Sequence, residues 1–140
     1  MRNRCFIDTN LFVYIYSNDK HGKSEKAREY IRMFSQNNDA YISSQVINEL
    51  SFWLFKNSYN QNDIIQILNE LNNNAVILLI NFNTTIKAID LKERYKMSWW
   101  DSLLLATALE NNCTIFYSED MQQNQIIENK MKIINPLIIN

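Results

Sequence analysis

The stretch Cys5-Phe6-Ile7-Asp8-Thr9-Asn10 joins a short apolar run to an acid that two polar residues follow. Three successive apolar residues predict a short buried strand, and the acid marks its carboxyl end. The pattern returns near the other end of the chain, where Thr114-Ile115-Phe116-Tyr117 precedes Ser118-Glu119-Asp120. Ligands of open α/β sheets bind outside the carboxyl ends of the strands, so we expect Asp8 and Asp120 on one rim.

Between these two strands, helical and strand patterns alternate. This alternation favours an α/β fold of three layers, with a short parallel sheet flanked by helices on both faces. The chain has 140 residues, which suits a single domain, 1–140, with one core. The apolar run 75–80 is typical of a strand covered on both faces. We predict strands at 5–7, 40–42, 75–80, 114–117 and 132–134, and helices at 10–16, 24–36, 44–56 (capped by Ser44), 61–73 (Ile64, Ile65, Leu68 and Leu71 inward), 84–95 and 99–110.

Composition is that of an ordinary globular protein, with 46% hydrophobic residues, 21% charged residues and a net charge of -1. The run 74–80 is too short for a membrane span, and no signal-peptide core follows Arg2 and Arg4. We therefore expect a cytoplasmic protein that makes no membrane contact. Since the net charge is close to zero, a polyanion would have to be held by a local basic face and by metal.

Residues that many catalytic sites need are scarce. The only glycine, Gly22, excludes a glycine-rich phosphate loop. The only histidine, His21, leaves zinc sites and Ser-His-Asp or Cys-His catalysis weakly supported. Cys5 and Cys113 lie in apolar runs and are expected to be buried, reduced thiols. Carboxylates are thus the remaining candidates for chemistry.

Glu49 occupies a helical position where an apolar residue is expected. It follows Val46 by three residues and precedes Trp53 by four, so it points to the same side of the helix as they do. A carboxylate aimed at a core must be hydrogen-bonded, neutralised or bound to metal. The structural alternative is a half-buried glutamate paired with a basic side chain.

The other three acids also have structural alternatives. Asp101 leads the apolar stripe of the last helix, but Ser98-Trp99-Trp100-Asp101 also resembles a capping box. Asp8 is a candidate cap of the helix that follows it. Asp120 could belong to an ordinary turn, and Glu119 is its rival for a place in a site.

Taken together, the four acids predict a site for hard divalent cations. Carboxylates gathered without cations repel one another, and Mg²⁺ or Mn²⁺, which prefer oxygen ligands, would remove that repulsion. With no nucleophilic serine, cysteine or histidine indicated, acid-bound metals suggest attack by water on a phosphodiester.

Four segments, in order, resemble the motifs of the PIN-domain nucleases. The resemblance covers nearly the whole chain, up to Ile133-Ile134-Asn135-Pro136, and is nearest to the compact VapC-type toxins of bacterial toxin–antitoxin pairs. Members often carry glycine before the fourth strand, where this chain has Asn111-Asn112; asparagine also tolerates the left-handed conformation of a helix end. The four segments are Phe6-Ile7-Asp8-Thr9-Asn10, Ser44-Gln45-Val46-Ile47-Asn48-Glu49-Leu50, Trp100-Asp101-Ser102-Leu103-Leu104-Leu105-Ala106-Thr107-Ala108 and Tyr117-Ser118-Glu119-Asp120.

The resemblance implies a PIN-like fold and a Mg²⁺- or Mn²⁺-dependent endoribonuclease. It also implies a homodimer, an RNA substrate and a small antitoxin protein that blocks the site. The residues that it implies are Asp8, Glu49, Asp101 and Asp120 as catalytic and metal-binding acids, with Asn10 and Ser118 supporting them.

Other functions fit parts of the pattern. A PIN-type nuclease could instead act on RNA or DNA in processing or repair. A degenerate domain could bind a partner without chemistry, although the presence of all four acids argues against this. A receiver or haloacid-type phosphatase fits poorly, because Asp8-Thr9-Asn10 lacks the second aspartate of the phosphatase motif.

Two surfaces could serve substrate and partner. Lys92, Arg94 and Lys96 precede Asp101 and could hold an RNA backbone near the metals, or could be ordinary solvated helix surface. Tyr95, Trp99 and Trp100 could stack on bases, although core packing is the ordinary role of such side chains. The helix face with Phe52, Phe55 and Tyr59 needs a cover, which a second subunit or an antitoxin would supply.

Overall fold

Five short parallel strands and one antiparallel strand form a single sheet in the computed structural model, which describes residues 3–17, 23–37 and 39–137. The order is β3-β2-β1-β4-β6-β5, so β1 and β4 lie at the centre. The parallel ladder runs from β3 to β6, and β5 pairs with β6 in the antiparallel sense. The bounds are β1 Arg4–Ile7, β2 Asp39–Ser43, β3 Val76–Leu78, β4 Ile115–Tyr117, β5 Ile126–Ile127 and β6 Met131–Ile134.

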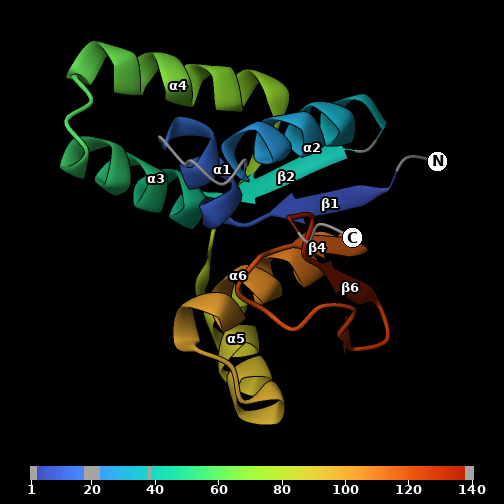
Figure 1. Cartoon of the computed structure of the whole chain (residues 1–140). Coiled ribbons are helices and arrows are strands. Elements are labelled where there is room, and N and C mark those ends of the chain that lie inside the picture. Colours follow the sequence, from blue (N-terminus) through green and yellow to red (C-terminus); the bar gives the residue numbers. More distant parts are fainter. Residues whose placement is uncertain (1–2, 18–22, 38, 138–140) are drawn as a thin grey trace.

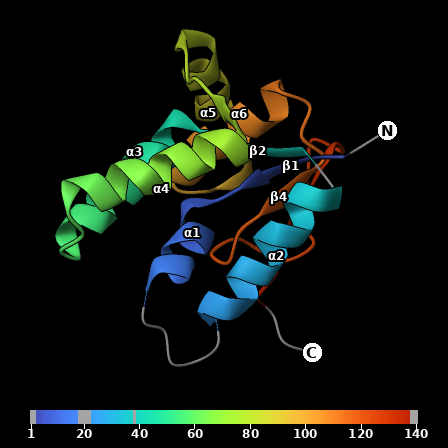
Figure 2. The ribbon, with the colours of Figure 1, turned by 90° about the horizontal axis from the view of Figure 1, so that it is seen from above.

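Helices cover both faces of the sheet and make the three layers that the sequence predicts. In Figure 1, α1, α2 and α4 lie on one face, and α5 and α6 lie on the other. Figure 2, turned by 90°, shows α3 and α4 running side by side on the flank away from α2. The bounds are α1 Thr9–Tyr16, α2 Lys23–Asn37, α3 Ser44–Lys56, α4 Gln61–Asn74, α5 Phe82–Tyr95 and α6 Trp99–Glu110.

The core is built around the β1–β4 pair. Phe6 and Phe116 face each other across the two strands, fully buried, with ring centroids 5.1 Å apart and planes 6° from parallel. Helix α6 is buried almost all round, from Ser102 to Ala108, because it lies between the sheet and α5. The two central strands are therefore fixed by packing on both faces, which positions their carboxyl ends.

Small polar residues begin the helices, as the sequence suggests, with one difference. The cap of α3 is Ser43, whose hydroxyl oxygen accepts from the Val46 N–H at 3.3 Å, rather than the predicted Ser44. The turn after α6 uses the predicted asparagine: Asn112 has φ 60°, the left-handed conformation that otherwise favours glycine. Each cap satisfies backbone N–H groups that the first helical turn leaves unpaired.

Three details of the predicted elements were wrong. The run 75–80 is not covered on both faces: only Val76–Leu78 is a strand, it lies at the edge of the sheet, and Val76 is 49% exposed. Helix α4 buries Ile67 in place of the predicted Ile65, which is 49% exposed. Strand β5 was missed, since two residues carry no periodic signal.

Two further expectations concern thiols and membranes. Cys5 and Cys113 are buried thiols that form no disulfide, as predicted. Within the described ranges, no helix combines the length and the apolar character that a membrane span needs. The only histidine, His21, lies outside the described residues.

Candidate active site at the carboxyl edge of the sheet

Asp8 lies one residue beyond β1, and its backbone N–H donates to the Tyr117 carbonyl at 3.0 Å, which ties it to the end of β4. Its side chain is 5% exposed and accepts two hydrogen bonds. One comes from the Thr9 backbone N–H at 2.7 Å, and the other from the Ser118 hydroxyl at 2.9 Å. Asp8 thus caps α1 and is also a buried acid at the carboxyl edge of the sheet. The structural and the functional interpretation of this residue are therefore compatible.

The pKa of Asp8 is raised from 3.8 to about 7. Burial is the main cause, because a charged carboxylate loses hydration there. The hydrogen bonds from Ser118 and Thr9 lower the pKa, and the negative charges of Asp101 and Asp120 raise it further. This carboxyl group is therefore partly protonated near neutral pH unless a cation compensates its charge.

Glu49 reaches the same edge from α3. It is half-buried, and its two carboxylate oxygens accept from neutral groups: Oε2 from the Thr9 hydroxyl at 2.7 Å, and Oε1 from Gln45 Nε2 at 2.6 Å. No described basic side chain forms an ion pair with it, so the structural alternative of a basic partner finds no support there. A bound cation would therefore not have to displace a basic partner from Glu49.

Asp101 stands in the first turn of α6. Its backbone N–H donates to the Ser98 hydroxyl oxygen at 3.1 Å, which makes Ser98 the cap of the helix. Burial raises the pKa of Asp101, a hydrogen bond with Ser98 lowers it, and the charges of Asp120 and Glu49 raise it again. Asp101 therefore interacts electrostatically with the other three acids, since it also raises the pKa of Asp8.

Asp120 and Glu119 take different directions after β4. The Asn10 side-chain amide donates to Asp120, whose backbone N–H donates to the Ser118 hydroxyl oxygen at 3.2 Å. Glu119 instead accepts from the Tyr14 hydroxyl on α1. Asp120 is exposed, and its charge acts on Asp8 and Asp101. The structure thus groups Asp120, rather than Glu119, with the other acids.

Three residues that contact the acids were missed in the sequence: Thr9, Gln45 and Tyr14. Gln45 lies four residues before Glu49, a spacing at which helical side chains meet, so this contact had a local signal. Thr9 and Tyr14 had none, because their partners are 40 and 105 residues away in the chain.

The acids do not form a closed metal cage. Among the described residues, no three acidic, cysteine or histidine side chains stand in position to bind one ion. Mg²⁺ does not require such a cage, since it keeps several waters and is commonly bound through one or two carboxylates. The donor set fits such an ion, because all four side chains offer hard oxygen ligands. Burial, and then the neighbouring acids, raise the pKa of Asp8 and of Asp101, so a bound cation would favour their charged forms.

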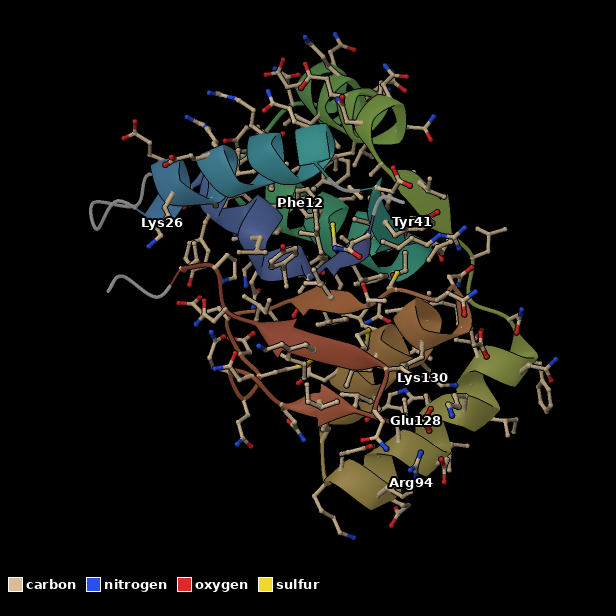
Figure 3. All side chains as sticks on the ribbon, turned by 90° about the vertical axis from the view of Figure 1, so that its right-hand side faces the viewer. Phe12, Lys26, Tyr41, Arg94, Glu128 and Lys130 are labelled. Atoms are coloured by element: carbon tan, nitrogen blue, oxygen red, sulfur yellow. The ribbon has the colours of Figure 1, made fainter. Side chains whose placement is uncertain are left out.

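The predicted basic cluster of Lys92, Arg94 and Lys96 does not act as a unit, because Arg94 forms ion pairs away from the acids. Arg94 pairs with Asp90 at 2.9 Å and with Glu128, which Lys87 also contacts at 2.6 Å. Figure 3 shows Arg94 beside Glu128. Glu128 lies in the turn before β6, at the amino edge of the sheet, opposite the acids. Arg94 is therefore held away from them, while Lys92 and Lys96 are exposed.

Asp8 should give the metal-free protein a distinctive dependence of stability on pH. Because its pKa is raised on folding, the folded state holds a proton that the unfolded chain releases, so stability falls as pH rises from about 4 to about 7. We expect the free energy of unfolding, measured by urea titration with chelator, to fall by on the order of 2–3 kcal/mol between about pH 5 and 7.5. Asp8→Asn should remove most of this decrease and leave the part that the raised pKa of Asp101 causes; equal slopes for both proteins would contradict the assignment.

Comparison with known proteins assigns the sequence to a family. The sequence matches the family described as PIN domain over residues 5–128. A comparison with curated proteins finds no match.

Three solved structures share the fold at low sequence identity. A chain of a toxin–antitoxin complex from Klebsiella pneumoniae is 17% identical, with a TM-score of 0.71, covering 94% of this chain and 97% of its own. A chain of VapBC2 from Rickettsia felis bound to a promoter DNA fragment is 18% identical, with a TM-score of 0.65 and coverages of 84% and 88%. VapC20 of Mycobacterium tuberculosis, a toxin that cleaves the sarcin–ricin loop, is 13% identical, with a TM-score of 0.65 and coverages of 83% and 91%. Because the family match spans most of the sequence, the chain belongs to the PIN domain family.

Proposed function

We propose that the protein is a metal-dependent endoribonuclease, the toxin of a type II toxin–antitoxin pair. The observation that carries this proposal is the group of four acids at the carboxyl edge, with a buried Asp8 whose pKa is raised to about 7. Without a cation, the carboxylates of such a group repel one another, and binding a cation relieves that repulsion. Toxin–antitoxin and VapC neighbours with the same fold support the choice of class.

The four acids would hold Mg²⁺ or Mn²⁺, and bound metal would supply water activation and charge neutralisation at a phosphodiester. The neighbouring polar side chains orient these acids. Ser118 holds Asp8 and the backbone of Asp120, and Asn10 holds the Asp120 carboxylate. Thr9 and Gln45 hold the two oxygens of Glu49. Oriented acids reduce the reorganisation that metal binding would otherwise require.

The partner and substrate are proposed from the neighbours. Two of these solved structures are toxin–antitoxin assemblies, and another is a toxin that cleaves the sarcin–ricin loop. We infer a small antitoxin protein that covers the acid cluster and an RNA substrate, with the cytoplasm as the place of action. A PIN-type nuclease of RNA processing or DNA repair would use the same acids but would need no inhibitor.

Inducing the chain in a bacterial host tests the toxin assignment. Growth should stop on induction of the wild type and continue when the small neighbouring reading frame is co-expressed. Asp8→Asn should allow growth without the partner. Unaffected growth with abundant wild-type protein would favour a nuclease of another pathway or a partner-binding module.

A homodimer is proposed from the exposed face of α3. Phe52 is 70% exposed and Phe55 is 62% exposed, a cost that a second copy would remove. The predicted third member, Tyr59, is not part of that face: it packs on Trp53 and donates to the Tyr16 carbonyl at 2.7 Å. Light scattering should show a dimer that Phe55→Ser converts to monomer; a wild-type monomer at high concentration would refute this.

A further inference from the structure

A surface pocket of about 900 Å³ opens directly beside the acid cluster, between α3 and the start of α6. Gln45, Asn48, Glu49 and Phe52 line it from one face of α3, at helical spacings of three and four residues. Trp100 lines it from α6, one residue before Asp101. Glu49 thus belongs both to the acid cluster and to the pocket wall, so whatever fills the pocket lies next to the candidate active site.

The rim of this pocket carries two exposed aromatic side chains. Trp100 is 62% exposed, so the expectation that it packs in the core was wrong, and Phe52 is 70% exposed. Aromatic faces in contact with water are surfaces on which nucleobases stack, and such stacking tolerates every base. None of the described residues that line the pocket is basic, which argues against a phosphate as its occupant.

One residue that lines the pocket has an acceptor without a donor. Gln45 Nε2 donates to Glu49, while the buried Gln45 Oε1 has no hydrogen-bond partner among the described residues. A buried, unpaired acceptor is costly, and a rotation of the side chain that brings it to a donor of a ligand would satisfy it. Every unpaired RNA base offers such a donor: an amino group in cytosine, adenine and guanine, and the ring N3–H in uracil.

We propose that this pocket receives an unpaired nucleobase adjacent to the scissile phosphate, stacked on Trp100. The inference rests on the proposed function, since it describes how the same site holds its RNA. Trp100 provides the stacking face, and Gln45 provides an acceptor for an N–H group of the base. In this arrangement the acids act on the phosphodiester, and the pocket holds the base beside it.

The test measures binding separately from cleavage. The full-length Asp8→Asn protein, which should bind without cutting, is titrated with fluorescently labelled oligo(C) and with an abasic strand of the same length, which keeps the phosphates and lacks the bases. Trp100→Ala in this background should weaken oligo(C) binding by roughly tenfold to a hundredfold, and Trp100→Phe should restore most of it. Phe82→Ala, which removes an exposed aromatic from α5 outside the pocket, is the matched control and should bind oligo(C) like the parent. The abasic strand should bind the parent no more tightly than it binds Trp100→Ala.

Each outcome separates this inference from the proposed function. Trp100-dependent binding together with a wild type that cuts no RNA would retain the pocket and refute the nuclease. A wild type that cuts RNA, with Trp100→Ala binding like the parent, would overturn the pocket alone. Equal affinity of the parent for oligo(C) and for the abasic strand would overturn the nucleobase as the occupant of the pocket. Monomer formation by Trp100→Ala without loss of RNA affinity would show that a second copy, rather than a base, covers the pocket.

Discussion

Replacing Asp8 with asparagine is expected to abolish RNA cleavage while the fold survives. The substitution removes the charge of the most buried acid of the cluster but nearly keeps its shape: the amide oxygen can still accept from the Thr9 N–H, and the amide nitrogen can donate to the Ser118 hydroxyl oxygen. If Asp8 holds the catalytic metal, the rate should fall on the order of a thousandfold or more, since several kcal/mol of charge stabilisation are lost. Manganese affinity, measured by titration calorimetry, should collapse in parallel.

The stability of the same variant provides an internal control. Without metal, Asp8→Asn should be at least as stable as the wild type at pH 7.5, because an asparagine carries no charge to desolvate and none to repel Asp101. Asp90→Asn, which changes an exposed acid of α5 paired with Arg94, should cut RNA normally. An Asp8→Asn protein that cuts like the wild type would refute the role of Asp8.

Phe116→Ala is expected to cause the largest loss of stability, about 3–5 kcal/mol, because it empties a fully buried site and removes the stacking partner of Phe6. Phe116 precedes Ser118 by two residues in the strand segment that holds Asp8, so cleavage should weaken as the rim loosens. The measurement is urea unfolding followed by circular dichroism.

An exposed phenylalanine gives the matched comparison. Phe82 is 76% exposed on α5, and Phe82→Ala should change the free energy of unfolding by no more than about 0.5 kcal/mol. If both variants lost the same stability, the β1–β4 packing would not be the centre of the core. If Phe116→Ala stayed as stable as the wild type, the stacked pair would be wrong.

The layers and the main strands could be predicted from the sequence because a buried parallel strand is a continuous run of apolar residues. Continuous apolar runs at Cys5–Ile7 and 114–117 are what a central parallel strand requires. The same rule failed for 75–80, since an edge strand that ends early can carry equally apolar residues, and Leu79 remains 77% exposed.

The parts of the candidate site that depend on local sequence pattern could be predicted. Strand ends placed Asp8 and Asp120, and helical spacing placed Glu49 and Asp101 among apolar neighbours. The choice of Asp120 over Glu119 depends on Asn10 and Tyr14, which lie on another element, so sequence spacing alone could not decide it. Likewise, helical periodicity did not show that Trp100 faces solvent, because α6 is apolar on nearly every side.

The most direct test of a metal-dependent ribonuclease is cleavage of a total small-RNA pool by the purified, partner-free wild type with Mg²⁺, with Mn²⁺ and with chelator. The account predicts discrete cleavage products with either metal, none with chelator, and recovery when excess metal is restored. Cleavage that persists in chelator would contradict the metal mechanism. Intact RNA in every condition, with the protein shown to be folded and metal-loaded, would contradict the nuclease itself.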